Sequence, residues 1–395
     1  MKIHKFTFYS LALFFVMGSL TVAGQNVSDK LKWSQRMAAT IMIEHPQSYM
    51  IDHANQPKWD YVHGLVLKSF QVLNQKYPNT TYENYVQDYL NQLIQNDGSI
   101  KGYAMESYNI DMVVAGRLLF DDYSKTKNKS YLTPLQKLRE QLKLQPRTAS
   151  GGFWHKKIYP NQMWLDGLYM GAPFYAQYTT TFEEDANWSD IVKQFELIQK
   201  NVRDNKTGLF YHAWDESKQM PWSNKQTGTS PNFWSRSLGW YAMALVDVLD
   251  YMPKDHPKRQ QLIQYLDELA KALVPFQDQS GLWYQVTDKG NTGGNYLEGS
   301  GSAMFSYALA KGANKGYINK KYKKIALKAF NGIVSKLVKV DSNGKITITQ
   351  VCAVAGLGGT PYRDGSFEYY VNEKKKDNDP KATGPFILAA LELNK

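Results

Sequence analysis

The stretch FWSRSLGWYAMAL at residues 233–245 decides the fold of this chain. After a polar and aromatic start it becomes a helical run that is apolar on nearly every side, and such a helix is buried. Gly239 lies inside the run, although glycine costs about 1 kcal/mol in a helix. The glycine therefore indicates a close approach, either of a neighbouring helix or of a ligand.

Five other segments repeat this combination of an apolar helical run and a small residue. Their glycines, spaced roughly 50 to 80 residues apart along the chain, are Gly64, Gly116, Gly167, Gly301 and Gly384. Amphipathic helices with charged faces are predicted between them. The clearest of these are Tyr82–Gln95, Trp188–Lys200, Arg259–Leu273 and Lys321–Leu337.

One buried and one half-exposed helix, repeated six times, predict two concentric rings of helices, which is the all-α six-hairpin (α/α)6 barrel. No linker interrupts the chain after residue 24, so we expect a single domain over residues 25–395. The loops Asp204–Trp214 and Asp278–Val286 share a turn followed by an aromatic, strand-like strip, and residues 96–103 are a weaker copy. Such strips would line one end of the barrel with rings, which suits a carbohydrate.

The first 24 residues have the features of a secretory signal peptide. Lys2 and Lys5 precede an apolar run from Phe6 to Val22, and small residues follow at Ala23 and Gly24. We therefore expect an exported protein, periplasmic or secreted, with no membrane attachment after cleavage. An uncleaved N-terminal anchor is the alternative, because the apolar run is slightly long.

The composition excludes several classes of protein. With 43% hydrophobic and 21% charged residues, the 395-residue chain is neither disordered nor fibrous. A single cysteine, Cys352, excludes an internal disulfide framework and a cysteine-rich zinc or iron–sulfur site. The net charge of +11 would allow a nucleic-acid partner, but the basic residues are scattered and no such partner is expected.

The sequence also lacks the motifs of common cofactor sites. It has no phosphate-binding or dinucleotide-binding glycine loop, and no two histidines have the helical spacing of a metal site. We therefore expect no cofactor and no metal. A serine hydrolase is not expected, because no stretch fits the Gly-x-Ser-x-Gly pattern of its nucleophile. Carboxylates remain, and they are the usual acid and base for sugar hydrolysis.

Asp111 and Asp166 are the best catalytic candidates, because each lies at the start of a buried helix. The aromatic and apolar neighbours of Asp166 would raise the pKa of its carboxyl and make it a proton donor near neutral pH. The structural alternative for both residues is a helix N-cap, where aspartate is common. Glu298 competes for the catalytic role, whereas Asp364 is typical of a turn.

His155, His212 and Arg236 are further polar residues in aromatic surroundings. Each histidine has the alternative role of a hydrogen-bonded structural residue. An arginine in apolar company needs an anion, and for Arg236 this is either an internal acid or a substrate carboxylate.

Several longer strings make the chain similar to glycoside hydrolase family 105, the unsaturated rhamnogalacturonyl hydrolases. The similarity runs from about residue 59 to residue 393. The strings are NIDxxxxGR from residue 109, WLDGLYMG from 164, HAWD from 212, FWSRSLGW from 233, YLEGSGSAM from 296 and GTPYRDGSFEYY from 359. The resemblance implies the same six-hairpin barrel.

The resemblance also implies a substrate and a mechanism. Family members remove the unsaturated 4-deoxy uronic acid that pectin lyases leave at the non-reducing end of an oligosaccharide. An acid protonates C4 of the C4=C5 vinyl ether, water adds at C5, and the hemiketal opens and releases the neighbouring sugar. By motif, Asp166 matches the general acid/base and Asp111 the partner carboxylate that holds the sugar. The positions that match the substrate pocket are Tyr61, His155, Lys156, Trp164, His212, Trp234, Arg236 and Trp240.

Two other functions fit the same barrel. One is the related unsaturated glucuronyl hydrolase activity on glycosaminoglycan fragments. The other is a sugar-binding protein without catalysis, against which the intact motifs around Asp111 and Asp166 argue.

Overall fold

A computed structural model describes residues 26–395, so the signal peptide predicted for residues 1–24 lies outside the described part of the chain. Six helical segments form an inner ring, in which each segment contacts the next and the last contacts the first. In ring order they are α2 (Tyr61–Lys76), the run η3 (Ile110–Met112), η4 (Val114–Leu118) and α4 (Leu119–Thr126), then α6 (Leu165–Thr181), α8 (Ser235–Leu249), α10 (Gly299–Asn314) and α13 (Pro380–Leu393).

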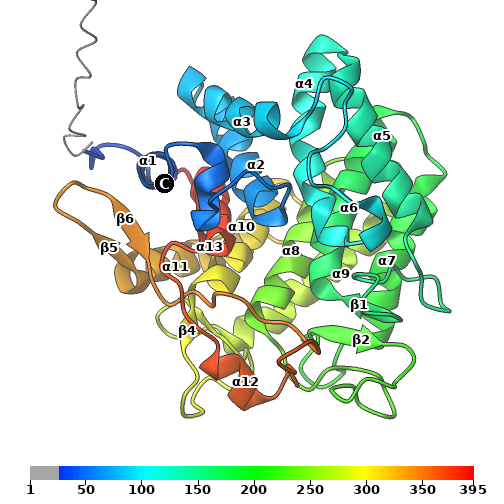
Figure 1. Cartoon of the computed structure of the whole chain (residues 1–395). Helices are drawn as coiled ribbons and strands as arrows, with labels where there is room; N and C mark the ends of the chain where they lie inside the picture. Colours follow the sequence, from blue (N-terminus) through cyan, green and yellow to red (C-terminus); the bar gives the residue numbers. More distant parts are fainter. Residues whose placement is uncertain (1–25) are drawn as a thin grey trace, which may run out of the picture.

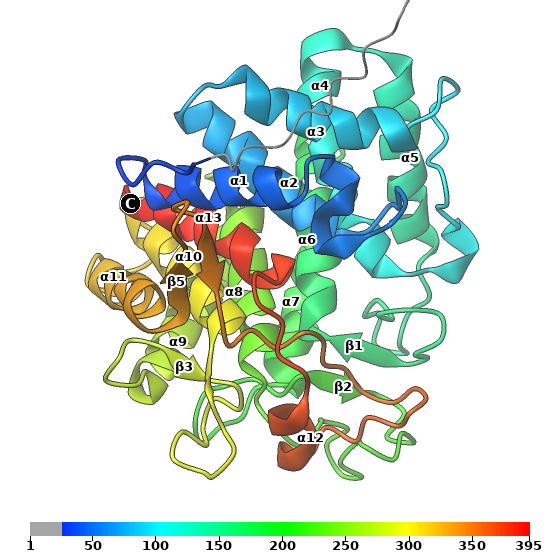
Figure 2. The same cartoon turned by 60° about the vertical axis from the view of Figure 1, so that its left-hand side comes forward.

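A second set of helices packs outside this ring, one against each inner segment. They are α3 (Thr80–Leu93), α5 (Lys129–Leu144), α7 (Asn187–Asn201), α9 (Arg259–Leu273), α11 (Tyr322–Gly332) and α1 (Trp33–Glu44). Figures 1 and 2 show the two layers, with α1 beside α13 and the C-terminus. The predicted (α/α)6 barrel is confirmed, and the first outer helix pairs with the last inner one.

The predicted outer helices agree closely with the structure. The range of α9 is the predicted one, and α3 and α7 differ from their predictions by no more than two residues at either end. The last predicted helix is divided, because the π-helical turn η6 (Ile333–Leu337) follows α11. Helices α1 and α5 had no individual prediction, and α5 carries Pro134 inside it.

The second inner segment is not the continuous apolar helix that was expected. Residues 110–118 form two 3-10 turns before α4 begins. Asn109 caps the first turn by accepting a hydrogen bond from the backbone N–H of Asp111 at 3.1 Å. The β-branched pair Val113 and Val114 follows, and such residues are poor α-helix formers. The consequence is a tighter backbone at the point where Asp111 is held.

The inner-ring glycines mark close helix approaches, as predicted. A Cβ atom on Gly64 of α2 would lie 2.6 Å from the Cα of Ala115 in η4. One on Gly301 of α10 would lie 2.7 Å from Oγ of Ser235 in α8. Gly167 differs from these, because its nearest neighbour is Nδ1 of His155 at 3.2 Å, a side chain of the candidate site. The glycine at 167 therefore makes room for a functional ring rather than for a helix.

Short strands gather near the starts of the inner helices. Strand β1 (Gln162–Trp164) leads directly into α6 and pairs with β2 (Ala213–Asp215). Strand β4 (Leu297–Glu298) leads into α10 and pairs with β3 (Trp283–Tyr284). The short helix α12 (Phe367–Asn372) lies on the same side, in the lower part of Figure 1. Strands β2 and β3 lie in the aromatic strips that the sequences of loops 204–214 and 278–286 predicted. The third antiparallel pair of strands is β5 (Val338–Val340) with β6 (Ile346–Ile348). The remaining 3-10 turns are η1 (Ser48–His53), η2 (Met105–Ser107) and η5 (Val274–Phe276).

A buried ion network joins the inner helices at the opposite end of the barrel. Asp247 of α8 accepts from Arg117 of η4 at 3.0 Å and from Lys311 of α10 at 2.7 Å. The hydroxyl of Tyr307 also donates to Asp247, at 2.7 Å, and Arg117 reaches Tyr169 of α6 at 3.3 Å. All three charged side chains are at least 90% buried. One carboxylate therefore ties three of the inner segments together, and Arg117 connects a fourth through Tyr169.

Among residues 26–395, no helix combines the length and the apolar character that crossing a membrane requires.

Candidate active site

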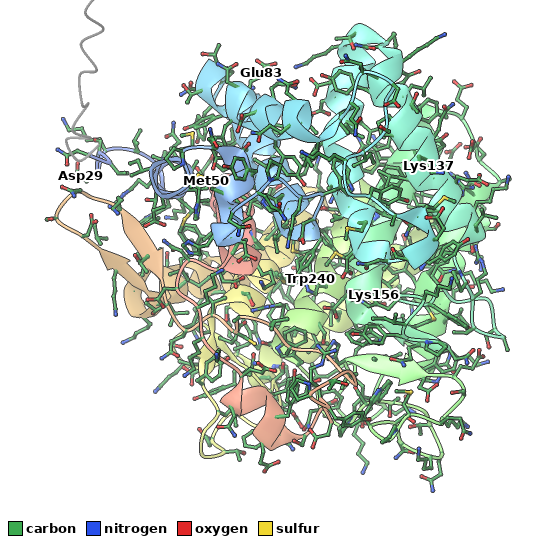
Figure 3. The ribbon with its side chains drawn as sticks, viewed as in Figure 1. Asp29, Met50, Glu83, Lys137, Lys156 and Trp240 are labelled. Carbon is green, nitrogen blue, oxygen red and sulfur yellow. The ribbon has the colours of Figure 1, made fainter. Side chains whose placement is uncertain are left out.

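The first turns of the inner helices meet at one end of the barrel, which we call the mouth. Tyr61 at the start of α2 has its ring centroid 6.5 Å from that of Trp240 in α8. Nε of Arg236 in α8 donates to Oγ of Ser300 in α10 at 2.7 Å. Figure 3 labels Trp240 together with Lys156, a residue of the loop before α6, toward the middle of the molecule in that view.

Asp166 is the second residue of α6 and lies beside His212. Its Oδ2 is 3.2 Å from Nε2 of His212, which precedes β2. The distance suits an ion pair, but neither of these two atoms has a well-aligned hydrogen bond. Catalytic hydrogen bonds are often poorly aligned before substrate binds and tighten afterwards. The N-cap alternative for Asp166 does not hold, because Trp164 occupies the cap position and the carboxylate faces the histidine.

The pKa of Asp166 departs from the sequence-based expectation. Burial raises the pKa of this carboxyl, as predicted, but its interactions with His212 outweigh burial. The pKa of Asp166 therefore lies below its usual value, and the expected increase is wrong for the substrate-free protein. The sequence could not reveal this, because residues 166 and 212 are brought together only by the pairing of β1 with β2.

Asp111 lies among a lysine and a second histidine. Nζ of Lys156 is 2.7 Å from one carboxylate oxygen and Nε2 of His155 is 3.3 Å from the other. Burial lowers the pKa of His155 to about 4, against the opposing effect of Asp111, so the ring is neutral near pH 7. Burial also disfavours the charge on Lys156, but Asp111 more than compensates and raises the pKa of the ammonium. Asp111 therefore has one charged partner and one neutral partner.

Trp164 contacts both of the histidines that lie beside the two carboxylates. The rings of His155 and Tyr159 lie nearly parallel to its indole, with centroids 4.7 and 4.9 Å away. The centroids of the His155 and Tyr159 rings are 6.3 Å apart. Two rings stacked on opposite faces of one indole would be separated by at least roughly 7 Å, which is twice a stacking distance. Both therefore cover the same face of Trp164, while His212 meets its edge at 5.1 Å. The indole is 5% exposed, so it orients the histidines more than it offers a free stacking face.

Trp234 and Trp240 are also packed by protein rings. Trp234 lies 4.8 Å from the ring of His212 and 6.0 Å from that of Tyr370 in α12. Trp240 stacks on Tyr169 at 4.9 Å and is buried. Of the predicted aromatic pocket residues, Tyr61 is only half-buried, whereas the three tryptophans are buried.

Arg236 has its anion inside the protein. The guanidinium lies 3.7 Å from Oε1 of Glu298, donates to the carbonyl oxygens of Cys352 and Ala353, and donates to Ser300. Arg236 and Glu298 are both almost fully buried. Of the two alternatives that the sequence left open, the internal acid is the partner seen in this structure. Glu298 also caps α10 by accepting from the N–H of Gly301, so it does not compete as an open acid.

Sequence reasoning missed three residues of the mouth. Tyr370 contacts His212, and Tyr159 covers Trp164. Lys381 is a buried cation in the first turn of α13, and it pairs at 2.8 Å with Asp379, the residue that caps this helix. Tyr370 lies within the C-terminal string quoted above, which was the available signal. Asp364 is a turn residue, as predicted, since its Oδ1 accepts from the N–H of Ser366 at 2.8 Å.

The part of the chain from residue 26 onward contains no cluster of three or more histidine, cysteine, aspartate or glutamate side chains that could hold a metal ion. The site described here consists of carboxylates, imidazoles, a lysine and aromatic rings.

Comparison with known proteins covers nearly the whole described chain. A family model described as Glycosyl Hydrolase Family 88 matches residues 33–395. A solved structure from C. acetobutylicum ATCC 824, a glycoside hydrolase from family 105, is 43% identical with a TM-score of 0.88, over 92% of this chain and 99% of that one.

Two further proteins are similar at lower identity. YesR of Bacillus subtilis, an unsaturated rhamnogalacturonyl hydrolase, is 26% identical over 295 residues, which cover 73% of this chain and 78% of that protein. The unsaturated glucuronyl hydrolase of Bacillus sp. GL1 has a TM-score of 0.66 at 10% identity, over 92% of this chain and 95% of that one, and it shares the fold alone.

Proposed function

The chain belongs to glycosyl hydrolase family 88, and from this premise we propose that it removes an unsaturated uronic acid from the non-reducing end of pectic, rhamnogalacturonan-type oligosaccharides. It is a glycoside hydrolase, as the resemblance to family 105 predicted. The pectic substrate is supported by the similarity to YesR, whose name states that activity. Export by the N-terminal segment stays a prediction, to be checked by sequencing the N-terminus of the mature protein.

The observation that carries the proposal is the pair of largely buried carboxylates at the mouth. Asp166 lies against one imidazole, and Asp111 lies against another imidazole and a lysine. In the proposed reaction Asp166 delivers a proton to C4 of the vinyl ether and then takes one from the water that adds at C5. Asp111, held by Lys156, binds a sugar hydroxyl and orients the ring. One carboxyl thus acts first as acid and then as base.

Because its pKa is lowered, Asp166 must take up a proton before it can act as an acid. Substrate binding favours this uptake. An unsaturated uronate brings a second negative charge beside Asp166 and excludes water from the mouth. Like charge and desolvation both favour the protonated carboxyl. The pKa of Asp166 therefore rises when substrate binds, and the acid becomes available only in the complex. A neutral substrate would lack the first of these two effects.

The test of the function is the loss of the ultraviolet absorbance of the conjugated uronate. We expect the protein to consume this absorbance in digests of rhamnogalacturonan made by a lyase. A panel of defined unsaturated disaccharides, pectic and glycosaminoglycan, compares this activity with the glucuronyl hydrolase alternative through kcat/KM. Binding that stabilises the protein without any loss of absorbance in the whole panel would identify a sugar-binding barrel and overturn the proposal.

Lys156→Met is expected to raise KM about tenfold for a free uronate and much less for its methyl ester. The reason is that the variant loses a charge-assisted hydrogen bond from the ammonium to the uronate carboxylate, which the ester cannot form at full strength. Lys156 is the suitable cation, since its side chain keeps 24% of its surface exposed. Arg236→Ala is the matched comparison, and it should affect both substrates equally because its guanidinium is bound inside the protein. A selective loss on the free uronate in Arg236→Ala would instead place that arginine on the substrate carboxylate.

A further inference from the structure

We propose that Tyr370 is a positioning residue that controls the proton shared by His212 and Asp166. The inference rests on the proposed function, in which Asp166 is the proton donor. Tyr370 does not face the substrate, and it acts through the histidine. Its role is to supply Nδ1 of His212 with a partner in both protonation states of the pair.

The contact is direct and buried. The hydroxyl of Tyr370 lies 2.8 Å from Nδ1 of His212, whose other nitrogen is 3.2 Å from Asp166. Tyr370 and His212 are both fully buried. Since an imidazole has only two ring nitrogens, Tyr370 and Asp166 account for both. The three side chains come from α12, the segment before β2, and α6, so they form one chain of contacts across the mouth.

Tyr370 is itself held in place by two buried side chains. The amide of Gln285 donates to the backbone carbonyl of Tyr370 at 3.1 Å, and its oxygen accepts from Nε1 of Trp234 at 3.1 Å. The indole of Trp234 then stacks on the ring of Tyr370 with an interplanar angle of 23°. This arrangement fixes the tyrosine ring relative to His212.

The hydroxyl is suited to both states because it can donate and accept. When Asp166 is ionised and His212 is neutral, the ring hydrogen is on Nε2 and faces the carboxylate, so Tyr370 donates to the lone pair of Nδ1. When the pair takes up one proton from solvent, Nδ1 also carries hydrogen and Tyr370 accepts. The hydrogen on Nε2 can then pass to Asp166, leaving a neutral imidazole. The tyrosine keeps its own proton throughout, and burial raises its pKa well above the usual value.

Removing the hydroxyl should lower the pKa of the pair. Without Tyr370 the protonated form would bury an N–H at Nδ1 with no acceptor, and an orphaned buried N–H costs more than an unused lone pair. The expected decrease is about one pH unit, the equivalent of one buried hydrogen bond. Other titratable and charged groups also surround this chain of contacts. They are His155 beside Asp166, Arg236 over Trp234, and Tyr369, Cys352 and Asp364 around Tyr370.

The first experiment uses the substrate-free protein labelled with ¹⁵N-histidine. The signal of His212 is assigned by its absence in His212→Gln and titrated in wild type, Tyr370→Phe and Tyr369→Phe. Tyr369 is the matched control, because its hydroxyl accepts from the N–H of Gly356 and does not face the histidine. We expect the midpoint to fall in Tyr370→Phe alone. Equal midpoints in all three proteins, or a wild-type tautomer with hydrogen on Nδ1 at high pH, would overturn the proposal.

The second experiment is kinetic. Tyr370→Phe is expected to lower kcat about tenfold with little change in KM, and to move the alkaline limb of kcat to lower pH. Tyr369→Phe should leave both the rate and the pH profile unchanged. A fall in kcat with an unmoved pH profile would mean that Tyr370 only packs. If wild type turns over no unsaturated uronide, the proposed function fails, while the histidine titration still decides the role of Tyr370.

Discussion

Asp166→Asn is expected to lower the turnover of an unsaturated uronyl disaccharide by more than about a hundredfold, while the barrel stays folded. An amide of the same shape keeps the contact with His212 but has no proton to give to carbon. The measurement is the initial rate of absorbance loss, together with the melting temperature of the variant. Substrate binding should persist, since the amide removes a negative charge next to an anionic sugar.

Asp364→Asn is the matched control for this variant. Asp364 lies in the C-terminal segment that carries α12, and its carboxylate serves only a turn, which asparagine also supports. It should retain the wild-type rate. A residual activity of Asp166→Asn within tenfold of wild type would assign the proton donor to another group, with Asp111 the next to test.

Asp247→Asn is expected to destabilise the protein by about 3 to 5 kcal/mol, because it leaves Arg117 and Lys311 buried without an anion. The melting temperature is the measurement. Asp267→Asn is the control, since its ion pair with Lys271 lies on the exposed face of α9 and should leave the melting temperature unchanged. A loss at Asp247 no larger than that at Asp267 would mean that the far end of the barrel is held by apolar packing alone.

The contribution of Asp247 should also depend on pH. Burial raises the pKa of its carboxyl, but Lys311 and Arg117 outweigh burial and lower the pKa to about 2. A carboxyl whose pKa is lower in the folded state than in the unfolded state stabilises the fold fully at pH values above its unfolded-state pKa, near 3.8. This stabilisation is lost as the pH falls through the folded-state pKa. The stability difference between wild type and Asp247→Asn should therefore be constant above about pH 5 and narrow between pH 4 and pH 2.

The fold could be predicted because its signal is local and repeated. An apolar helix with an internal glycine, followed by an amphipathic helix, can be recognised in each repeat without knowing its neighbours. The break at residues 110–118 could not be predicted in the same way. The Asn109 cap and the β-branched pair favour a break locally, but the close approach of Ala115 to Gly64 in another helix is not reported by local sequence.

The site could be predicted as a set of residues but not as a set of pairs. The motifs identified Asp111, Asp166 and both histidines, and all of them lie at the mouth. Which histidine serves which acid follows from the register of β1 against β2. The same register reverses the expected pKa of Asp166. The internal partner of Arg236 was also out of reach, because residues 236 and 298 are 62 positions apart in the sequence.

The parallel direction of the inner helices has an electrostatic consequence. Each α-helix carries about half a positive charge at its N-terminus through its aligned peptide dipoles. Because α2, α6, α8, α10 and α13 all begin at the mouth, their backbones make this end of the barrel attractive to anions before any side chain is counted. That field acts in the same direction as His212, which lowers the pKa of Asp166 in the substrate-free protein. It should also favour sugar acids over neutral sugars, even in a variant that lacks Lys156.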